Sequence, residues 1–75
     1  MRVAIERVLS EISGQVCRIE VAVGDRVAED DALLFIESMK MEIPVSATAG
    51  GVVKELLVAS GDSVSEGTPL AILET

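Results

Sequence analysis

The sequence lacks histidine, tryptophan and tyrosine, and it holds a single phenylalanine, Phe35, and a single cysteine, Cys17. The absence of histidine removes the commonest general acid or base and the commonest metal ligand. A lone cysteine cannot form an internal disulfide, and without a histidine partner it is not expected to act as a nucleophile. We therefore expect no catalytic residue and no metal site, and a core built from Val, Ile, Leu and Ala.

Basic residues are also scarce. The chain has 6 Lys and Arg and 13 Asp and Glu, which gives a net charge of −7. An acidic chain repels phosphate backbones, so nucleic acid is not an expected partner. No apolar run approaches the roughly 20 residues of a membrane span, and Glu6 and Arg7 interrupt the first apolar stretch, so neither a membrane nor a signal segment is expected. With the lone cysteine, these features predict a cytoplasmic protein.

The chain has 75 residues, which predicts one domain over residues 1–75. Within it, two halves repeat one another. After a shift of 37 residues, segment 13–38 aligns with segment 50–75 without a gap, and ten of the 26 positions are identical, where chance would give roughly two or three. The identical pairs are Gly14/Gly51, Val16/Val53, Val21/Val58, Ala22/Ala59, Gly24/Gly61, Asp25/Asp62, Val27/Val64, Glu29/Glu66, Leu33/Leu70 and Glu37/Glu74.

Each half is typical of short strands separated by turns. The two Gly-Asp pairs indicate turns, because Gly tolerates a positive φ and Asp bonds nearby backbone. Closing strands are predicted at Ala32–Ser38 and Pro69–Glu74, and the run 33–36 is apolar at both parities, which predicts burial on both faces. Two all-β halves of this size favour a small barrel or sandwich of about eight strands.

The repeat also predicts where the middle of the chain lies. The same shift carries residues 2–12 onto residues 39–49, so a twofold relation between the halves would place the junction near Ser38–Lys40 opposite the chain ends. The Lys40 region and the two termini are therefore expected at opposite poles of the domain.

The junction reads Glu37-Ser38-Met39-Lys40-Met41-Glu42. This stretch resembles the biotin attachment sequence of biotin carboxyl carrier proteins, in which the modified lysine lies between two methionines. The Gly-x-Val…Val-x-x-Gly-Asp-x-Val pattern of both halves is also similar to that family, and the resemblance extends over residues 12–74. The chain departs from the family at Asp30, where Gly is usual, and in segment 10–13, which lacks the common proline-rich strand entry.

The resemblance implies a flattened β-barrel of two four-stranded antiparallel sheets with pseudo-twofold symmetry and the lysine on an exposed tight hairpin. It implies that a biotin protein ligase joins biotin covalently to Lys40, with Met39 and Met41 as flanking recognition residues and Glu37 three positions before. It also implies a non-catalytic carrier subunit that shuttles carboxybiotin between a biotin carboxylase subunit and a carboxyltransferase subunit, which delivers the carboxyl group to an acyl-CoA, often acetyl-CoA. Catalysis is then expected in other chains.

This role agrees with the chemistry of an exposed lysine. The amine of a lysine in water is almost wholly protonated at neutral pH, so its activation must come from the ligase. Once acylated, the side chain loses its charge and becomes a flexible tether that gives biotin a high effective concentration at partner sites.

Alternative interpretations remain open at this point. Residues 39–46 alternate apolar and polar, so Lys40 fits the polar face of an amphipathic strand, and Met39 and Met41 fit as packing residues. A lipoyl carrier of a 2-oxo acid dehydrogenase is similar in fold, although lipoyl domains usually place Asp before the lysine. The barrel could also be an unmodified interaction module. Residues 29–31 have the composition of a cation site, but a solvated turn is the favoured interpretation.

Overall fold

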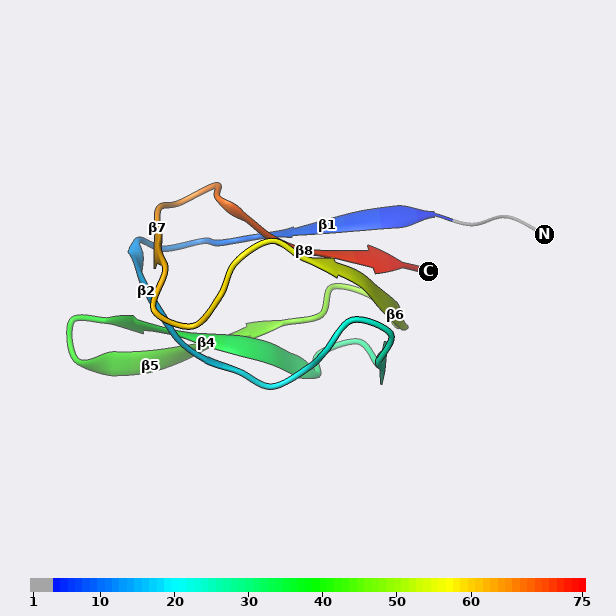
Figure 1. Ribbon diagram of the computed structural model, residues 1–75, viewed down its shortest axis with the longest axis horizontal. Helices are drawn as coiled ribbons and strands as arrows, with labels where there is room; N and C mark the ends of the chain where they lie inside the picture. Colours follow the sequence, from blue (N-terminus) through cyan, green and yellow to red (C-terminus); the bar gives the residue numbers. More distant parts are fainter. Residues whose placement is uncertain (1–3) are drawn as a thin grey trace.

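The computed structural model describes residues 4–75, which form eight β-strands and no helix. The strands make two four-stranded antiparallel sheets, which confirms the predicted fold class (Figure 1). The predicted closing strands coincide with two of the observed elements. The strands are β1 (Ile5–Leu9), β2 (Gly14–Ile19), β3 (Arg26–Val27), β4 (Ala32–Ser38), β5 (Met41–Ser46), β6 (Gly51–Leu56), β7 (Ser63–Val64) and β8 (Pro69–Glu74).

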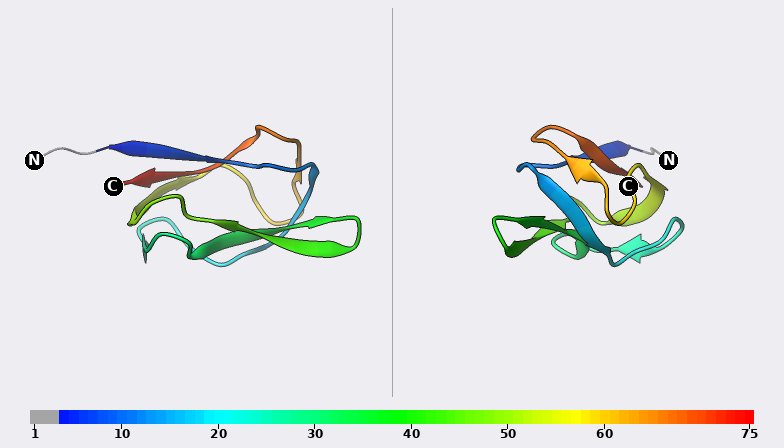
Figure 2. Two further views of the ribbon diagram at one scale, coloured as in Figure 1. Left: turned by 180° about the vertical axis from the view of Figure 1, so that it is seen from behind. Right: turned by 60° about the vertical axis from the view of Figure 1, so that its left-hand side comes forward.

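The two halves of the sequence are interleaved in the sheets. One sheet has the order β1-β8-β6-β3 and the other has the order β5-β4-β2-β7, so each sheet takes two strands from each half. Advancing every strand of the first sheet by four strands, which is one 37-residue repeat, converts it into the second. Figure 2 shows the two sheets packed face to face. Neither half can therefore form its sheets without the other.

Backbone hydrogen bonds obey the same twofold relation. Gly24 N donates to Val53 O at 2.8 Å, and Gly61 N donates to Val16 O at 2.7 Å. The turns that follow are also matched, because the side chains of Asp25 and Asp62 each accept a bond at 2.9 Å from the backbone N–H three residues earlier. Gly24 and Gly61 have φ of 98° and 97°, a conformation that only glycine adopts easily. The predicted turn role of the Gly-Asp pairs is thus confirmed.

The core consists of two symmetry-related clusters of buried side chains. One contains Val8, Val27, Leu33, Ala47, Val53, Ala71 and Leu73, and the other contains Val16, Leu34, Ile36, Val64 and Leu70. The 37-residue shift maps the first cluster onto the second, except that Val45 is only partly buried and Ser10 replaces Ala47. Ser10 is buried but satisfied, since its Oγ donates to Ile12 O at 2.6 Å. Burial of these aliphatic side chains, each worth about 1.5–3 kcal/mol, is what holds the two sheets together.

β-Bulges break the alternation of side chains along the central strands. The register of β4 with β5 skips Leu33, and the register of β8 with β1 skips Leu70. An extra residue at a bulge lets two consecutive side chains point inward, so Leu33 and Leu34 are both fully buried. The prediction that 33–36 is buried on both faces is wrong for Phe35, which is half-buried on the outer face of the sheet, with the Arg18 guanidinium 4.2 Å from its ring centroid.

Candidate cofactor attachment site

Lys40 lies in a two-residue turn between β4 and β5. Ser38 pairs with Met41, which leaves Met39 and Lys40 as the whole loop. Their φ values are 53° and 67°, so both residues adopt the left-handed conformation required at the centre of a type I′ turn. Gly and Asn are the usual occupants of such positions, because Gly has no Cβ to clash and the short polar side chain of Asn can form local hydrogen bonds. The sequence therefore places two unfavoured residues at this turn, which the pairing of β4 with β5 holds in place.

Side chains at the turn extend into solvent. Met39 is 92% exposed and Met41 is 64% exposed, which rules out the interpretation of these methionines as packing residues. Lys40 is also exposed and belongs to the turn, so its interpretation as part of the polar face of a strand is wrong. The lysine is therefore flanked on both sides by exposed apolar side chains.

The turn lies at the pole opposite the start of β1 and the C-terminus, which agrees with the prediction as far as the described residues reach. In Figure 1 the β4–β5 hairpin is at the left, and the beginning of β1 and the C-terminus are at the right of a domain whose extents are 43 × 19 × 18 Å. The symmetry counterpart of the Ser38–Met41 pair is formed by Ala4 and Thr75, which exchange two backbone hydrogen bonds of 2.9 and 3.3 Å. The positions equivalent to Met39 and Lys40 are residues 2 and 3, which lie outside the described residues.

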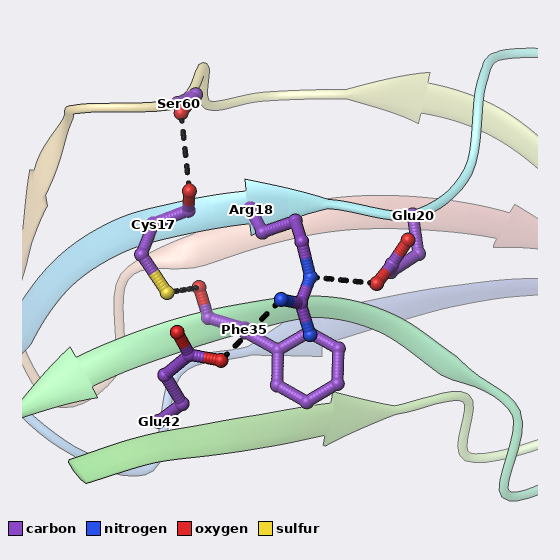
Figure 3. Close-up of polar contacts among 6 residues, drawn as sticks. All are labelled: Cys17, Arg18, Glu20, Phe35, Glu42 and Ser60. Atoms are coloured by element: carbon purple, nitrogen blue, oxygen red, sulfur yellow. Dashed lines mark hydrogen bonds and ion pairs between the residues drawn. The ribbon is translucent and has the colours of Figure 1, made fainter.

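Arg18 organises the carboxylates on the outer face beside the hairpin (Figure 3). Its Nε lies 2.7 Å from Glu20 Oε1, and its Nη1 lies 3.5 Å from Glu42 Oε1. Glu37, three residues before Lys40, is exposed on β4 opposite Glu42. Within the described residues, neither carboxylate forms an ion pair with Lys40. The sequence alone could not predict that Arg18 contacts Glu20, Phe35 and Glu42, because these residues come from three separate strands and the turn after β2.

Cys17 is the extra residue of a bulge in β2 and lies at the edge of the same region. Its thiol is partly buried and donates a weak hydrogen bond of 3.4 Å to Phe35 O, while Ser60 Oγ donates to Cys17 O at 3.4 Å. Figure 3 shows that these contacts tie β2 to β4 and to the loop after β6. The residue therefore has a packing role.

Asp30 keeps the backbone conformation that Gly has at its symmetry counterpart. Its φ is 75°, and that of Gly67 is 90°. The Asp31 carboxylate accepts a bond from Ala28 N at 2.9 Å, as expected for a solvated turn.

Across residues 4–75, no group of His, Cys, Asp or Glu has an arrangement that could hold a metal ion. Over the same stretch, no helix has the length and apolar character needed to cross a membrane.

A rigid two-sheet barrel that presents one lysine amine on a tight turn at its pole is the architecture of a carrier domain. The comparisons with known proteins identify the family. A family model described as "Biotin-requiring enzyme" matches residues 8–73, and the chain belongs to this biotin/lipoyl attachment family. The prediction of biotin as the cofactor agrees with this membership.

Two relatives show the range of the family. The chain is 40% identical over 68 residues to a "Biotinylated protein TB7.3 homolog" of Mycobacterium leprae, covering 91% of this chain and 96% of that protein. It is 44% identical over 59 residues to the dihydrolipoyllysine-residue acetyltransferase component of the pyruvate dehydrogenase complex of Haemophilus influenzae, covering 79% of this chain but only 10% of that protein. Sequence identity alone thus connects the chain to biotin and to lipoyl carriers.

A solved structure shows the same fold. The urea carboxylase of Kluyveromyces lactis matches with a TM-score of 0.89 and 37% sequence identity, over 93% of this chain and 6% of that chain. The chain therefore corresponds to a small part of that urea carboxylase and to nearly the whole length of the mycobacterial relative.

Proposed function

We propose that this domain is a biotin carrier in which Lys40 Nζ holds biotin through an amide bond. The observation that supports this proposal is the position of Lys40 at the tip of a two-residue turn, exposed between two exposed methionines. When bound, biotin supplies a ureido nitrogen that accepts and releases a carboxyl group. The domain itself supplies the reactive amine, the β-scaffold that holds it and the lysine side chain that serves as a flexible tether.

Each feature of the turn has a defined part in attachment. The Lys40 amine attacks the carboxyl carbon of biotin that the ligase has activated as an adenylate, so a C–N bond forms, AMP leaves and the amine releases a proton. The fixed turn presents the amine without a search over backbone conformations, which lowers the entropic cost of reaching the ligase site. Met39 and Met41 offer the ligase apolar contacts on both sides, and Glu37 offers a carboxylate at a fixed offset.

We further propose that the domain serves a biotin carboxylase and a carboxyltransferase located in other domains or chains. The acceptor of the carboxyl group is proposed to be an acyl-CoA, with acetyl-CoA as the first candidate. The likeness to a urea carboxylase adds urea as an acceptor to be assayed beside several acyl-CoAs. Bicarbonate-dependent ATP hydrolysis by the native assembly, stimulated by one acceptor alone, would identify the substrate.

Lys40 and Lys54 are the two lysines of the chain, which allows a clean test of the attachment site. The full chain is incubated with biotin protein ligase, ATP and biotin, and its intact mass is measured. We expect one addition equal to biotin less water, no addition to Lys40→Arg, and full addition to Lys54→Arg. Native-gel mobility gives a second readout, because acylation removes one positive charge from a chain of net charge −7. Modification of Lys40→Arg would contradict the proposal.

A lipoyl carrier is the second candidate, favoured by the 44% identity to a dihydrolipoyllysine-residue acetyltransferase component. Met39 occupies the position where lipoyl domains usually have Asp, which argues for biotin. Parallel reactions with biotin ligase and lipoate ligase separate the two. Lipoylation without biotinylation would reverse the assignment, and refusal of both groups would favour an unmodified interaction module.

A further inference from the structure

We propose that the free edge of β1 is a docking site for an extended, basic segment of a partner protein, which adds to the sheet as a fifth strand. The site is independent of Lys40, so it goes beyond the carrier function. It rests on the backbone groups that β1 leaves unpaired, on the groove beside them and on the charge of that groove.

β1 pairs with β8 on one side and ends its sheet on the other. Ala4 directs both backbone groups toward Thr75 of the neighbouring chain segment. Because the hydrogen-bonding direction alternates along an antiparallel strand, Glu6 and Val8 also face β8, and Ile5, Arg7 and Leu9 face the open edge. The edge thus offers three N–H and three C=O groups in the spacing that an added strand requires.

The symmetry counterpart of β1 lacks this capacity. β5 is the edge strand of the other sheet, and its residue equivalent to Arg7 is Pro44. Proline has no N–H, so the central donor of that edge is missing, which is a common way to blunt an exposed edge. The other two edges are formed by β3 and β7, which are two residues long. Among the described strands, β1 is therefore the long edge with a complete set of donors.

An open groove of about 1020 Å³ runs between β1 and β5. Its apolar lining includes Val8, Leu9, Ile12, Ile43 and Val45, of which Leu9 is 45% exposed. The groove contains four carboxylate residues against one basic residue, Arg7. The carboxylates are Glu11, Glu29, Asp30 and Glu66, and together they form the acidic rim.

The acidic rim selects the chemistry of the occupant. A strand on β1 places alternate side chains over the groove, where basic residues would lie near the rim and opposite Glu6. The opposite face of that strand lies beside Ile5 and Leu9, which favours apolar residues. A second copy of this chain fits poorly, because the antiparallel register that pairs all five residues of β1 sets Arg7 against Arg7.

Docking at this edge would leave the carrier hairpin free. The groove lining begins at Ile43 and does not include the turn at Met39–Lys40. A partner strand would therefore anchor the barrel by its flank while the lysine at the pole remains available to an active site.

The test is a ¹⁵N–¹H NMR titration of the full Lys40→Arg chain with a blocked heptapeptide, Lys-Val-Val-Glu-Lys-Ile-Lys, designed to pair with β1. We expect saturable shifts of the Ile5, Arg7 and Leu9 amides, with a Kd on the order of 1 mM because a short flexible peptide pays a large ordering cost. The matched control peptide carries N-methyl groups on its second, fourth and sixth residues, which face β1, and it should give no saturable shift at these amides.

Two variants of Arg7 separate backbone pairing from charge. Arg7→Pro removes the edge-facing N–H, and Pro44 shows that the equivalent backbone accommodates proline; binding should weaken at least tenfold. Arg7→Met keeps the N–H and removes the charge, so binding should change at most about fivefold. The methylated peptide tests the same claim on the parent chain if the proline variant fails to fold.

Three outcomes would overturn the proposal. Equal shifts with both peptides would indicate charge attraction alone, and the absence of saturable shifts at β1 would exclude binding there. If the β1 resonances change with protein concentration in the absence of peptide, the occupant is a second copy of the chain. The Lys40→Arg background cannot be biotinylated at that position, so failure here leaves the attachment proposal untouched, and failure of attachment leaves this test valid.

Discussion

The two halves of the barrel share one backbone, yet they differ at the places where the domain meets other molecules. Val16 and Val53, or Leu33 and Leu70, are identical and equally buried. By contrast, the first half ends in the exposed turn at Met39–Lys40, and the second half ends at the chain terminus. Equivalent core positions diverge little and mostly stay apolar because packing constrains them, whereas the turn and the sheet edges are free to acquire functions.

The largest loss of stability should come from truncating equivalent side chains in the core. Leu33→Ala and Leu70→Ala each remove a fully buried side chain at matching bulges in the two clusters. Each change should lower the free energy of unfolding by about 2–5 kcal/mol, and the two values should agree within about 1 kcal/mol. Urea denaturation followed by circular dichroism measures both, with Val replacing Ala if the Ala variants do not fold. Losses that differ severalfold would show that the energetic symmetry is absent.

A smaller loss of stability is expected when a glycine is replaced where two backbone segments approach closely. A Cβ at Gly14 would overlap Glu37 O, and a Cβ at Gly51 would overlap Glu74 O. Gly14→Ala and Gly51→Ala should each cost about 1–3 kcal/mol, because a central strand must shift to accept the methyl group. Gly24→Ala is the control, since no atom lies within 4 Å of its added Cβ and its cost of about 1 kcal/mol comes from φ alone. Differential scanning calorimetry of the three variants checks the order, and an equal loss in all three would refute it.

The turns at Asp30 and Gly67 allow a reciprocal exchange. Asp30 holds a left-handed φ that glycine accepts without strain, so Asp30→Gly should raise the free energy of unfolding by about 0.5–1 kcal/mol. Gly67→Asp should lower it by a similar amount, and the double exchange should be close to neutral. Thermal melts of the three variants measure this, and destabilisation by Asp30→Gly would mean that the Asp30 side chain makes a contact that outweighs its backbone strain.

The smallest change in stability is expected at the carrier turn. Met39→Asn places a residue preferred at the first centre of a type I′ turn, so stability should rise by about 0.5 kcal/mol. Biotinylation by the ligase should nevertheless slow, because the exposed methionine side chain is lost. Initial rates measured by mass spectrometry at several protein concentrations give this answer. An unchanged rate would show that the ligase does not read Met39.

The internal repeat made the fold predictable from the sequence. The matched Gly-Asp turns and the 37-residue shift predicted the symmetry, the strands over Ala32–Ser38 and Pro69–Glu74, and the placement of the lysine opposite the C-terminus and the start of β1. These succeed because alternation and turn chemistry are local properties of the chain. The bulge at Leu33 was not predicted, since an extra residue in a strand leaves no local signature, and the run 33–36, with Phe35, was therefore expected to be buried on both faces.

Features that depend on contacts between distant segments could not be predicted. The pairing of Arg18 with Glu42 requires the register of β2 on β4 and of β4 on β5. The acidic rim gathers residues from two turns and one loop on either side of the twofold axis. At the attachment site, the sequence identified the lysine and its neighbours, but the positive φ of Met39 became visible only in the structure.

The carrier function proposed for this domain requires that the Lys40 amine, at the pole opposite the C-terminus, carries biotin. The most direct measurement is tandem mass spectrometry of proteolytic fragments of the chain isolated from its own cells. We expect a biotinyl group on Lys40 and an unmodified Lys54. An unmodified Lys40, a lipoyl group on it, or biotin on Lys54 would contradict the account.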